Sequence, residues 1–333
     1  MRGLLVSVCA LLLLAACGGT AAAPSAAALE RDTLRVGVAG SGNSAVPLRI
    51  ALDQGYFKKH GLNVTVSTVG GAVGNQAIVS GSLDIDHGSA SMITAHLAGA
   101  DSIYMAAPTN KSPNMLFGKK GLTSVADLKG KTVSLAGPGT TRDIFLHAAA
   151  RKVGLEVGKD VKALYSAGDP SALAAFLSGQ SDAALVAPPA STQLQSEGYP
   201  VLLDFPKEGL HVIEPGMIVA RQFFQRNPNT LKAYLMGYLD AVKRAFDDPA
   251  LAKKTESMSA QIDDPNVLES DYQMGLQTWN KNMAVDPADI QLVLDAVGDA
   301  KAKAAQPADF YDNSYIDAVN RGYASKLFPG EVR

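Results

Sequence analysis

The stretch Ile78–Ile85, IVSGSLDI, has a counterpart about ninety-five residues further along the chain in Phe176–Ala183, FLSGQSDA. In both, apolar residues lead into a glycine, and an aspartate follows just before the next apolar run. Glycine ends a helix in the left-handed conformation, and the residues after it enter a strand. Two further pairs recur in the same order, Val38–Asn43 with Leu135–Thr140 and His60–Val64 with Val153–Val157. Three landmarks in register indicate two similar α/β lobes.

Short β-branched runs alternate with helical stretches from Leu34 onward, which favours parallel sheets covered by helices. The first lobe is predicted to open with a strand at 34–38, and the second lobe to begin near Ser124. The chain is expected to cross between the lobes at Met115–Gly118 and Val212–Ala220. The predicted fold is therefore α/β, with lobe 1 at 34–117 plus 214–333 and lobe 2 at 118–213.

The region after the second crossover is predicted to be mostly helical, and several of its helices open with proline at a first-turn position. The predicted helices are Thr230–Asp247, Pro249–Met258, Pro265–Met274, Pro287–Lys303 and Asn313–Leu327. Because such helices must cover an apolar surface, we expect them to pack on lobe 1.

The start of the chain has the features of an export signal. Met1-Arg2 precedes an apolar run at 4–14 that is too short to cross a bilayer stably. Leu14–Cys17, LAAC, then resembles the bacterial lipobox, in which the cysteine receives lipid. We predict a signal peptide at 1–16, a lipidated Cys17 and a flexible linker through residue 33, which places the protein in the cell envelope on the extracytoplasmic side of the membrane. The alternative is an ordinary secretory signal with an incidental cysteine.

Composition excludes several classes of function. With 333 residues that are 47% hydrophobic, the chain can build its core without disulfides, and no cysteine follows Cys17. A formal net charge of −2 gives no footprint for nucleic acid. No metal or cofactor site is predicted, because the histidines lack ligand spacing. They are His60, His87, His96, His147 and His211, of which His87 falls closest to the predicted cleft.

Ligands of open α/β sheets bind beyond the carboxyl ends of the strands, which predicts four loops that face each other. The candidate ligand-binding residues are Ser41, Gly42, Asn43, Ser89, Ala90, Ser91, Gly139, Thr140, Thr141 and Pro188. Thr140 and Thr141 start a helix whose free N–H groups favour an anion, and Arg142 adds positive charge. The alternative for each Ser or Thr is that it only caps the next helix. Glu214, at the second crossover, is a further candidate that either holds an amine or solvates a hinge.

Two other interpretations of the sequence are weaker. Gly40–Ala45 fits a dinucleotide fingerprint, but the second strand ends without the acidic residue that would bind a ribose. Trp279, the single tryptophan, fits the core better than a platform for a ligand. No catalytic residue is predicted, because the cleft loops offer hydroxyls, glycines and prolines without a nucleophile and base pair.

The stretch Asp53–Val64, DQGYFKKHGLNV, resembles the opening signature of the nitrate/sulfonate/taurine and thiamine-pyrimidine family of periplasmic binding proteins. Four other stretches match the same family in the same order: Ser80–Asp84, Asp127–Val133, Asn227–Tyr234 and Tyr311–Tyr315. The resemblance covers essentially all of 34–327.

This resemblance implies a type II periplasmic binding protein fold, with two α/β lobes that are joined by two crossovers and close around a small molecule. It further implies delivery of that molecule to the permease of an ABC importer, and we expect a monomer. By position, the contacts of the family fall on Ser41, Asn43, Ser89, Ser91, Thr140 and Thr141. The loops lack an aromatic residue to stack on a pyrimidine, which favours a sulfonate, nitrate, taurine or related organic anion. The alternatives are a pyrimidine receptor, an enzyme or a sensor without a permease.

Overall fold

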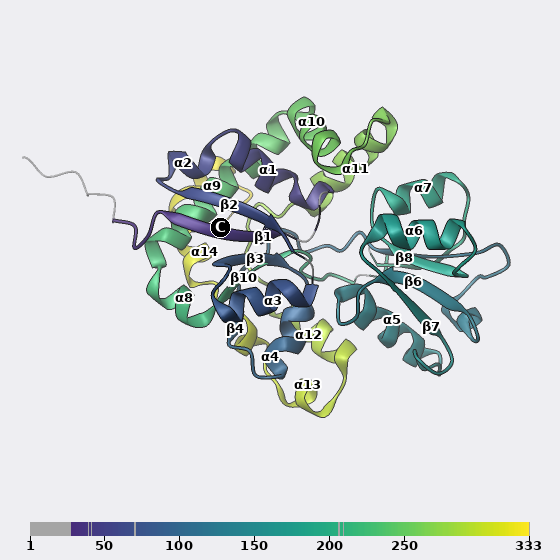
Figure 1. Ribbon diagram of the computed structural model, residues 1–333. Coiled ribbons are helices and arrows are strands. Elements are labelled where there is room, and N and C mark those ends of the chain that lie inside the picture. The colour runs from purple at the N-terminus through teal and green to yellow at the C-terminus, as the bar shows by residue number, and fades with distance from the viewer. Residues whose placement is uncertain are drawn as a thin grey trace, which may run out of the picture.

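A computed structural model describes residues 28–38, 40, 42–69, 71–205, 207–208 and 210–332. The predicted signal peptide, Cys17 and Ser41 lie outside the described residues. The described chain forms two lobes that lie side by side and are joined by two connections (Figure 1). Within these residues, no helix is long and apolar enough to cross a membrane.

Lobe 1 is built on a five-stranded sheet in the order β2-β1-β3-β10-β4. β10 is antiparallel to its neighbours β3 and β4, and the other pairs are parallel. One apolar core joins one face of this sheet to α1, α2 and α9, while α3 and α4 belong to the opposite face. The elements are β1 (Thr33–Val38), η1 (Asn43–Ala45), α1 (Val46–Asp53), α2 (Tyr56–Lys59), β2 (Asn63–Thr68), α3 (Gly71–Ser80), β3 (Ile85–Gly88), α4 (Ser91–Leu97), β4 (Ser102–Ala106), β10 (Gly216–Ala220), α8 (Arg221–Arg226) and α9 (Pro228–Asp247).

Lobe 2 repeats this architecture with the strand order β7-β6-β8-β5-β9, in which β5 is antiparallel to β8 and β9. Its elements are β5 (Met115–Gly118), η2 (Val125–Leu128), β6 (Thr132–Ala136), α5 (Thr141–Lys152), β7 (Lys162–Ser166), α6 (Asp169–Leu177), β8 (Ala183–Val186), α7 (Ala190–Ser196) and β9 (Val201–Asp204). The two sheets share one topology, so the predicted duplication and the predicted fold class are confirmed.

The repeated glycine and aspartate have the same two roles in both lobes. Gly81 and Gly179 take the left-handed conformation, with φ of +73° and +82°, at the ends of α3 and α6. The Asp84 carboxylate then accepts the backbone N–H of Arg35 at 2.8 Å, and the Asp182 carboxylate accepts that of Thr132 at 2.9 Å. Each aspartate therefore ties the helix-to-strand turn to the first strand of its lobe.

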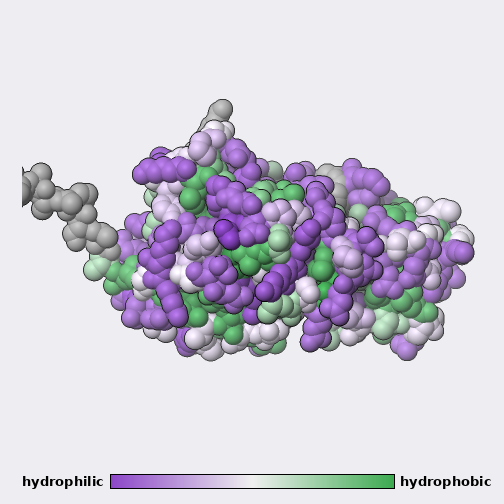
Figure 2. All heavy atoms as spheres, turned by 90° about the horizontal axis from the view of Figure 1, so that it is seen from above, coloured by the Kyte–Doolittle hydropathy of each residue, from purple (hydrophilic) through white to green (hydrophobic). Residues whose placement is uncertain are grey.

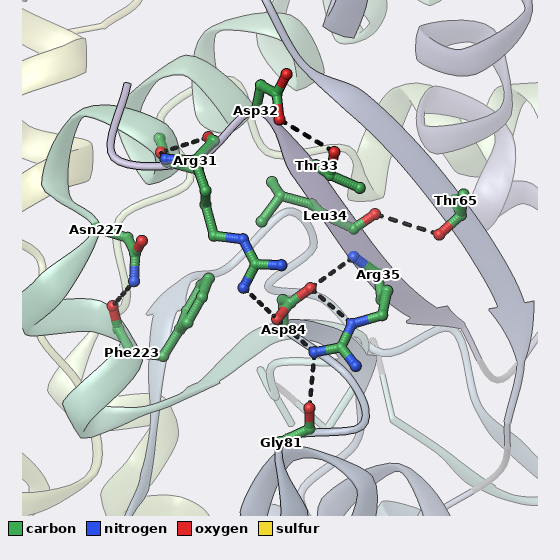
Figure 3. A network of polar contacts seen from close by, with 11 residues as sticks. Arg31, Asp32, Thr33, Leu34, Arg35, Thr65, Gly81, Asp84, Phe223 and Asn227 are labelled. Atoms are coloured by element: carbon green, nitrogen blue, oxygen red, sulfur yellow. Dashed lines mark hydrogen bonds and ion pairs between the residues drawn. The ribbon is translucent and has the colours of Figure 1, made fainter. Parts of the chain in front are cut away.

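In lobe 1 the same aspartate also fastens the N-terminal segment. Figure 3 shows Asp84 between two guanidinium groups, with Arg31 at 3.1 Å and Arg35 at 2.9 Å. The Glu30 carboxylate accepts the backbone N–H groups of Asn229 and Thr230 at the start of α9. The chain thus joins the folded body at residues 30–35.

The first crossover differs from the sequence expectation. Met115–Gly118 does not connect the lobes, because as strand β5 it hydrogen bonds to β8 and β9 inside the second sheet. The connection is the preceding segment 107–114, so lobe 2 starts at residue 115 and not at 118. The second connection occupies 205–215 and ends at the start of β10, which lies in the first sheet.

The C-terminal helices do not all cover lobe 1. They are α10 (Pro249–Ala260), α11 (Pro265–Thr278), α12 (Pro287–Val297), α13 (Ala300–Ala304), η3 (Pro307–Phe310), α14 (Ser314–Val319), η4 (Asn320–Ala324) and α15 (Ser325–Leu327). The helix expected at 287–303 is divided, because Gly298 has a φ of +68°. α12 packs against α5 of lobe 2, and one apolar cluster contains residues of both helices. The C-terminal region therefore connects the lobes as well as covering lobe 1.

Candidate functional site

The loops at the carboxyl ends of the strands meet across the two lobes. The backbone N–H of Ala90, before α4, donates to Thr141 Oγ1 of lobe 2 at 3.2 Å, and both residues are buried. On the other side of the site, a Cβ atom added to Gly42 would lie 3.7 Å from the carbonyl oxygen of Pro188. The structure therefore brings together the predicted loops in two facing pairs.

The serines of the α4 loop are positioned by lobe 1 itself. Ser91 Oγ accepts a hydrogen bond from the buried Asn75 Nδ2 at 2.9 Å and lies 3.1 Å from Ser89 Oγ. The hydroxyl of Tyr104, on β4, donates to the carbonyl oxygen of Ser89 at 3.0 Å. This network gives the loop a defined shape next to its contact with lobe 2.

The start of α5 already holds a carboxylate. Asp143 Oδ2 accepts the backbone N–H of Gly139 at 2.8 Å, and Tyr165 donates to Asp143 Oδ1 at 2.8 Å. Thr140 is the N-cap, and its hydroxyl donates to the carbonyl oxygen of Gly137 at 2.8 Å. A negative side chain thus lies where the sequence predicts an anion, and Thr140 has the capping role that was the alternative for it.

The Arg142 side chain is also bound by other residues of the protein. Its guanidinium forms an ion pair with Asp169 at 2.9 Å, and its Nε donates to Asn114 Oδ1 at 2.5 Å. Burial raises the pKa of Asp169, and the charge of Arg142 acts against that rise. The positive charge predicted to attract an anion is therefore balanced within lobe 2.

Glu214 joins this network from the second crossover. Its Oε2 accepts from Asn114 Nδ2 at 2.8 Å and from Ser112 Oγ at 3.2 Å, and both donors are buried in the first crossover. Across the described part of the chain, no Lys, Arg or His nitrogen lies within 4.0 Å of the Glu214 carboxylate. Asn114 therefore links both crossovers to Arg142, and Glu214 is held by neutral donors only.

A further carboxylate, Asp86 on β3, lies on the same face of the sheet as α3. It is 2% exposed, and Cβ atoms added to Gly37, Gly74 or Gly88 would come within 2.6 Å of its carboxylate. Glycine at these positions leaves the space that the carboxylate fills. Burial raises the pKa of Asp86 to about 6. Burial also raises the pKa of Tyr104, and the charges of Glu214 and Asp86 raise it further, so both acids act on the same hydroxyl.

Three residues that the sequence analysis considered for the site form hydrogen bonds within the folded body of lobe 1. Asn43 Nδ2 donates to the carbonyl oxygen of Asp271 at 3.2 Å, and the carbonyl oxygen of Asn43 accepts from Trp279 Nε1 at 2.9 Å. Trp279 is 5% exposed in the core of lobe 1. His87 lies within hydrogen-bond distance of the Tyr234 hydroxyl, at 2.8 Å, and burial lowers its pKa to about 3. His87 thus points into the core and away from the cleft.

A cavity of about 700 Å³ lies beside these loops, between α6 and α7 of lobe 2 and the α10–α11 turn of the C-terminal region. Asp169 and Pro189 line it, and Pro189 directly follows the predicted Pro188. No ligand-binding residue named from the sequence lines this cavity. The polar network around Asn114 and Glu214 and the cavity are therefore neighbouring parts of one region between the lobes.

The sequence interpretation did not identify Asp86, Tyr104 and Asn114 as part of the site. A usable signal existed for Asp86, which is an acidic residue inside a strand with a glycine two residues later. Asn114 carried no such signal, because its importance depends on the position of β5. Within the described residues, no group of three or more His, Cys, Asp and Glu side chains could hold a metal ion.

The contact between Ala90 and Thr141 can be tested directly. Thr141→Val keeps the shape of the side chain but leaves a buried N–H without an acceptor, so the free energy of unfolding should fall by about 1–2 kcal/mol. Hydrogen exchange should show faster exchange of the Ala90 amide. The amide of Ile93, which donates to the carbonyl oxygen of Ala90, is the internal reference. Unchanged protection of Ala90 would contradict the assignment of this contact.

Comparison with known proteins agrees with this architecture. A family model described as NMT1/THI5 like matches residues 43–252. No curated protein matches the chain significantly. Three solved structures share the fold: a protein of Bordetella bronchiseptica RB50, the alkanesulfonate-binding protein SsuA from Xanthomonas axonopodis pv. citri and the periplasmic nitrate-binding protein NrtA from Synechocystis PCC 6803.

The sequence identities to these three proteins are low, at 24%, 22% and 16% respectively. The TM-scores are 0.80, 0.67 and 0.72 in the same order. The similarity covers 89% of this chain and 99% of the Bordetella protein, 92% and 97% for SsuA, and 91% and 92% for NrtA. The likeness extends over both lobes and shows that the chain has their fold.

Proposed function

Since this chain belongs to the NMT1/THI5-like family, we propose that it is an extracytoplasmic solute-binding protein that captures a small molecule between its lobes and delivers it to the permease of an ABC importer. The observation that supports this most strongly is the position of the polar network at Asn114, which contacts both crossovers and lobe 2 at once. The contacts of a ligand bound there depend on the angle between the lobes.

The mechanism follows from differential affinity. A ligand changes an equilibrium between open and closed forms only if it binds one form more tightly. The residues that meet across the lobes, Ala90 with Thr141 and Gly42 with Pro188, are apart in any form in which the lobes separate. A ligand that contacts both lobes stabilises the closed form, and we propose that the permease recognises that form.

Several observations support binding without catalysis. Ser89 and Thr140, whose half-buried hydroxyls belong to the facing loops, form hydrogen bonds with a hydroxyl and a carbonyl group, not with a base. Asp169 and Arg142, an acidic and a basic side chain beside these loops, form an ion pair with each other. The chain is accordingly proposed to be a non-enzymatic receptor that acts as a monomer. The face seen in Figure 2 fits this proposal, because its surface is mostly hydrophilic and its hydrophobic side chains form separate small patches.

A thermal-shift screen of the purified protein tests this function. The compounds are taurine, alkanesulfonates, nitrate, aminopyrimidines and aromatic acids. A ligand at a hundredfold excess over its Kd stabilises the folded state by about 2.7 kcal/mol, which gives a clear rise in Tm. Product analysis after long incubation should recover the ligand unchanged, and turnover would favour an enzyme.

We further propose that Cys17 carries lipid and holds the receptor at the membrane through the segment that precedes residue 30. Cys17→Ser should then release or mislocalise the protein, while ligand binding by the folded body stays unchanged. Membrane fractionation and the thermal-shift assay measure these two outcomes. The matched control is Cys9→Ser, because Cys9 is the only other cysteine and falls inside the predicted signal peptide. Equal release by both variants, or by neither, would contradict the anchor.

A further inference from the structure

The two lobes meet along two flanks that differ in packing. α12 contacts both α4 of lobe 1 and α5 of lobe 2, and we call this side of the interface the packed flank (Figure 1). Arg151, at the end of α5, donates to the carbonyl oxygen of Ala296 on α12. One apolar cluster joins these two helices, and its buried members there are Ile144, Phe145, Leu146, Ile290, Val293 and Leu294. Separating the lobes on this flank would expose that apolar surface to water, which costs free energy in proportion to its area.

The crossovers lie on the same flank. The Phe205 ring, at the start of the second crossover, packs on the Phe145 ring of α5, with the ring centres 5.3 Å apart. The first crossover begins at Ala107, whose backbone N–H donates at 2.7 Å to the carbonyl oxygen of Met283, shortly before α12. The segment that leads into α12 therefore holds the first crossover in place, and α12 acts as a third connection between the lobes that is not covalent.

The other side of the interface, the open flank, is formed by α6 and α7 of lobe 2 and by the turn between α10 and α11. Here the lobes enclose the cavity of about 700 Å³, so their side chains are not packed together. Thr192 of α7 lines the cavity, and its Oγ1 donates to Asp271 Oδ1 of α11 at 3.4 Å. A hydrogen bond of this length is weak, and the residues beside it already face a cavity. Separating the lobes on this flank therefore exposes little additional apolar surface.

Both partners of this contact are connected to the predicted ligand-binding loops. The Asp271 side chain is buried beside Glu256 of α10, and the carbonyl oxygen of Asp271 accepts from Asn43 Nδ2 at 3.2 Å. Thr192 lies in the first turn of α7, which begins two residues after Pro188. A ligand that draws the loops of Asn43 and Pro188 together therefore also brings Thr192 and Asp271 into contact.

Resting on the proposed function, we infer that the lobes open on one flank only. The packed flank stays closed, Thr192 and Asp271 form a latch on the open flank, and the ligand enters and leaves through the cavity beside this latch. The latch closes when a ligand joins the loops of Asn43 and Pro188. Its hydrogen bond therefore adds to the free-energy difference between the open and closed forms.

Cross-links that fix one flank at a time test this inference. The chain has two cysteines, so Cys9→Ser with Cys17→Ser gives a full-length protein without thiols. Two cysteines are then introduced on one flank and joined by a short bismaleimide. The pairs are Ser196→Cys with Asn266→Cys, which both line the cavity, and Arg151→Cys with Val297→Cys on the packed flank.

Hydrogen exchange of the Ala90 amide, which donates to Thr141 of lobe 2, measures how often the lobes separate. The cross-link on the open flank should slow this exchange by about tenfold or more, whereas the cross-link on the packed flank should leave it unchanged. Equal slowing by both cross-links, slowing by the packed-flank cross-link alone, or slowing by neither would overturn the inference. Because the exchange is measured without a ligand, these outcomes are separate from the thermal-shift screen, which tests the proposed function itself.

Thr192→Val tests the latch, because it removes the hydroxyl and keeps the shape of the side chain. Exchange of the Ala90 amide should become about threefold faster or more, while the amides of β1 and β6, which report on global unfolding, keep their rates. Ser196→Ala is the matched control and should change nothing. Ser196 is exposed on the same helix, lines the same cavity and donates to the carbonyl oxygen of Gln193 within α7 at 2.7 Å. Unchanged exchange in Thr192→Val, equal acceleration in both variants, or acceleration of every amide alike would overturn the inference.

Discussion

Replacing Asn114 with leucine should lower the free energy of unfolding by about 3–6 kcal/mol, because two hydrogen bonds to charged groups are lost and each contributes about 1.5–3 kcal/mol. Asn114 is 0% exposed, donates to Glu214 at 2.8 Å and accepts from Arg142 at 2.5 Å. Leucine has a similar volume but leaves the carboxylate and the guanidinium each short of a partner in a place with little water. Urea denaturation of the variant and the parent protein measures the difference.

The same variant should also abolish stabilisation by the ligand, since both crossovers lose their link to Arg142. Asn110→Leu is the control for this prediction. Asn110 lies on the same crossover and is half-buried, and it should lose less than about 0.5 kcal/mol, as is usual for substitutions away from special features. If the two asparagine variants have equal stability, Asn114 is not the central residue of the network.

Patterns that repeat along the chain predicted the fold well. The glycines that end α3 and α6 and the aspartates that follow them recur because each lobe must fasten the same turn to the same strand. Such local requirements are visible in a sequence. The sequence did not show which sheet β5 and β10 join, because both are short apolar runs whose partners come from distant segments. That is why Met115–Gly118 looked like a connection.

The sequence predicted the position of the candidate site but not its charge balance. The loops at the strand ends were identified, and Ala90 does meet Thr141. The expected preference for an anion came from Arg142 and the start of α5 taken alone. Their partners are Asp169, twenty-seven residues away along the chain, and Asp143 within α5 itself, and only the folded chain shows that these acids use the available donors. Whether a charge is free depends on tertiary contacts, which a single sequence does not report.

Stability should fall as the pH rises from 7 to 8.5, because a pair of acids is buried where α10 meets α11. Glu256 is 1% exposed and Asp271 is 0% exposed. Burial, the charge of Asp271 and a hydrogen bond to it raise the pKa of Glu256 to about 8. The folded state therefore retains a proton on Glu256 that the unfolded chain releases near its ordinary pKa of 4.5. Asp271 also accepts from Thr192 of lobe 2 at 3.4 Å, so the pair lies at a contact between the lobes.

The sign of the effect follows from this difference in proton binding. A raised pKa in the folded state gives stability that is fully present below the unfolded pKa and is lost as the pH rises through the folded pKa. Each unit of pKa difference corresponds to about 1.36 kcal/mol, so the loss due to Glu256 alone from pH 5 to pH 8.5 should be on the order of 2–4 kcal/mol. Asp86, Asp271 and Asp289 have pKa values raised by burial to about 6 and add to the slope mainly below pH 7. The interval from pH 7 to 8.5 therefore isolates Glu256.

Glu256→Gln should remove most of the slope in that interval, because the amide can donate to Asp271 at every pH without losing a proton. Urea denaturation at pH 7, 7.8 and 8.5 should show the variant overtaking the parent protein in stability at the highest pH. The matched control is Glu269→Gln on α11, whose carboxylate pairs with Lys253 at 2.7 Å on the surface, and it should keep the parental slope. A parent protein whose stability does not change between pH 7 and 8.5, or a Glu256→Gln variant with the full slope, would show that the proton is not held by this pair. A loss of the slope only in the variant would instead place that proton between α10 and α11, next to the contact that Thr192 makes from lobe 2.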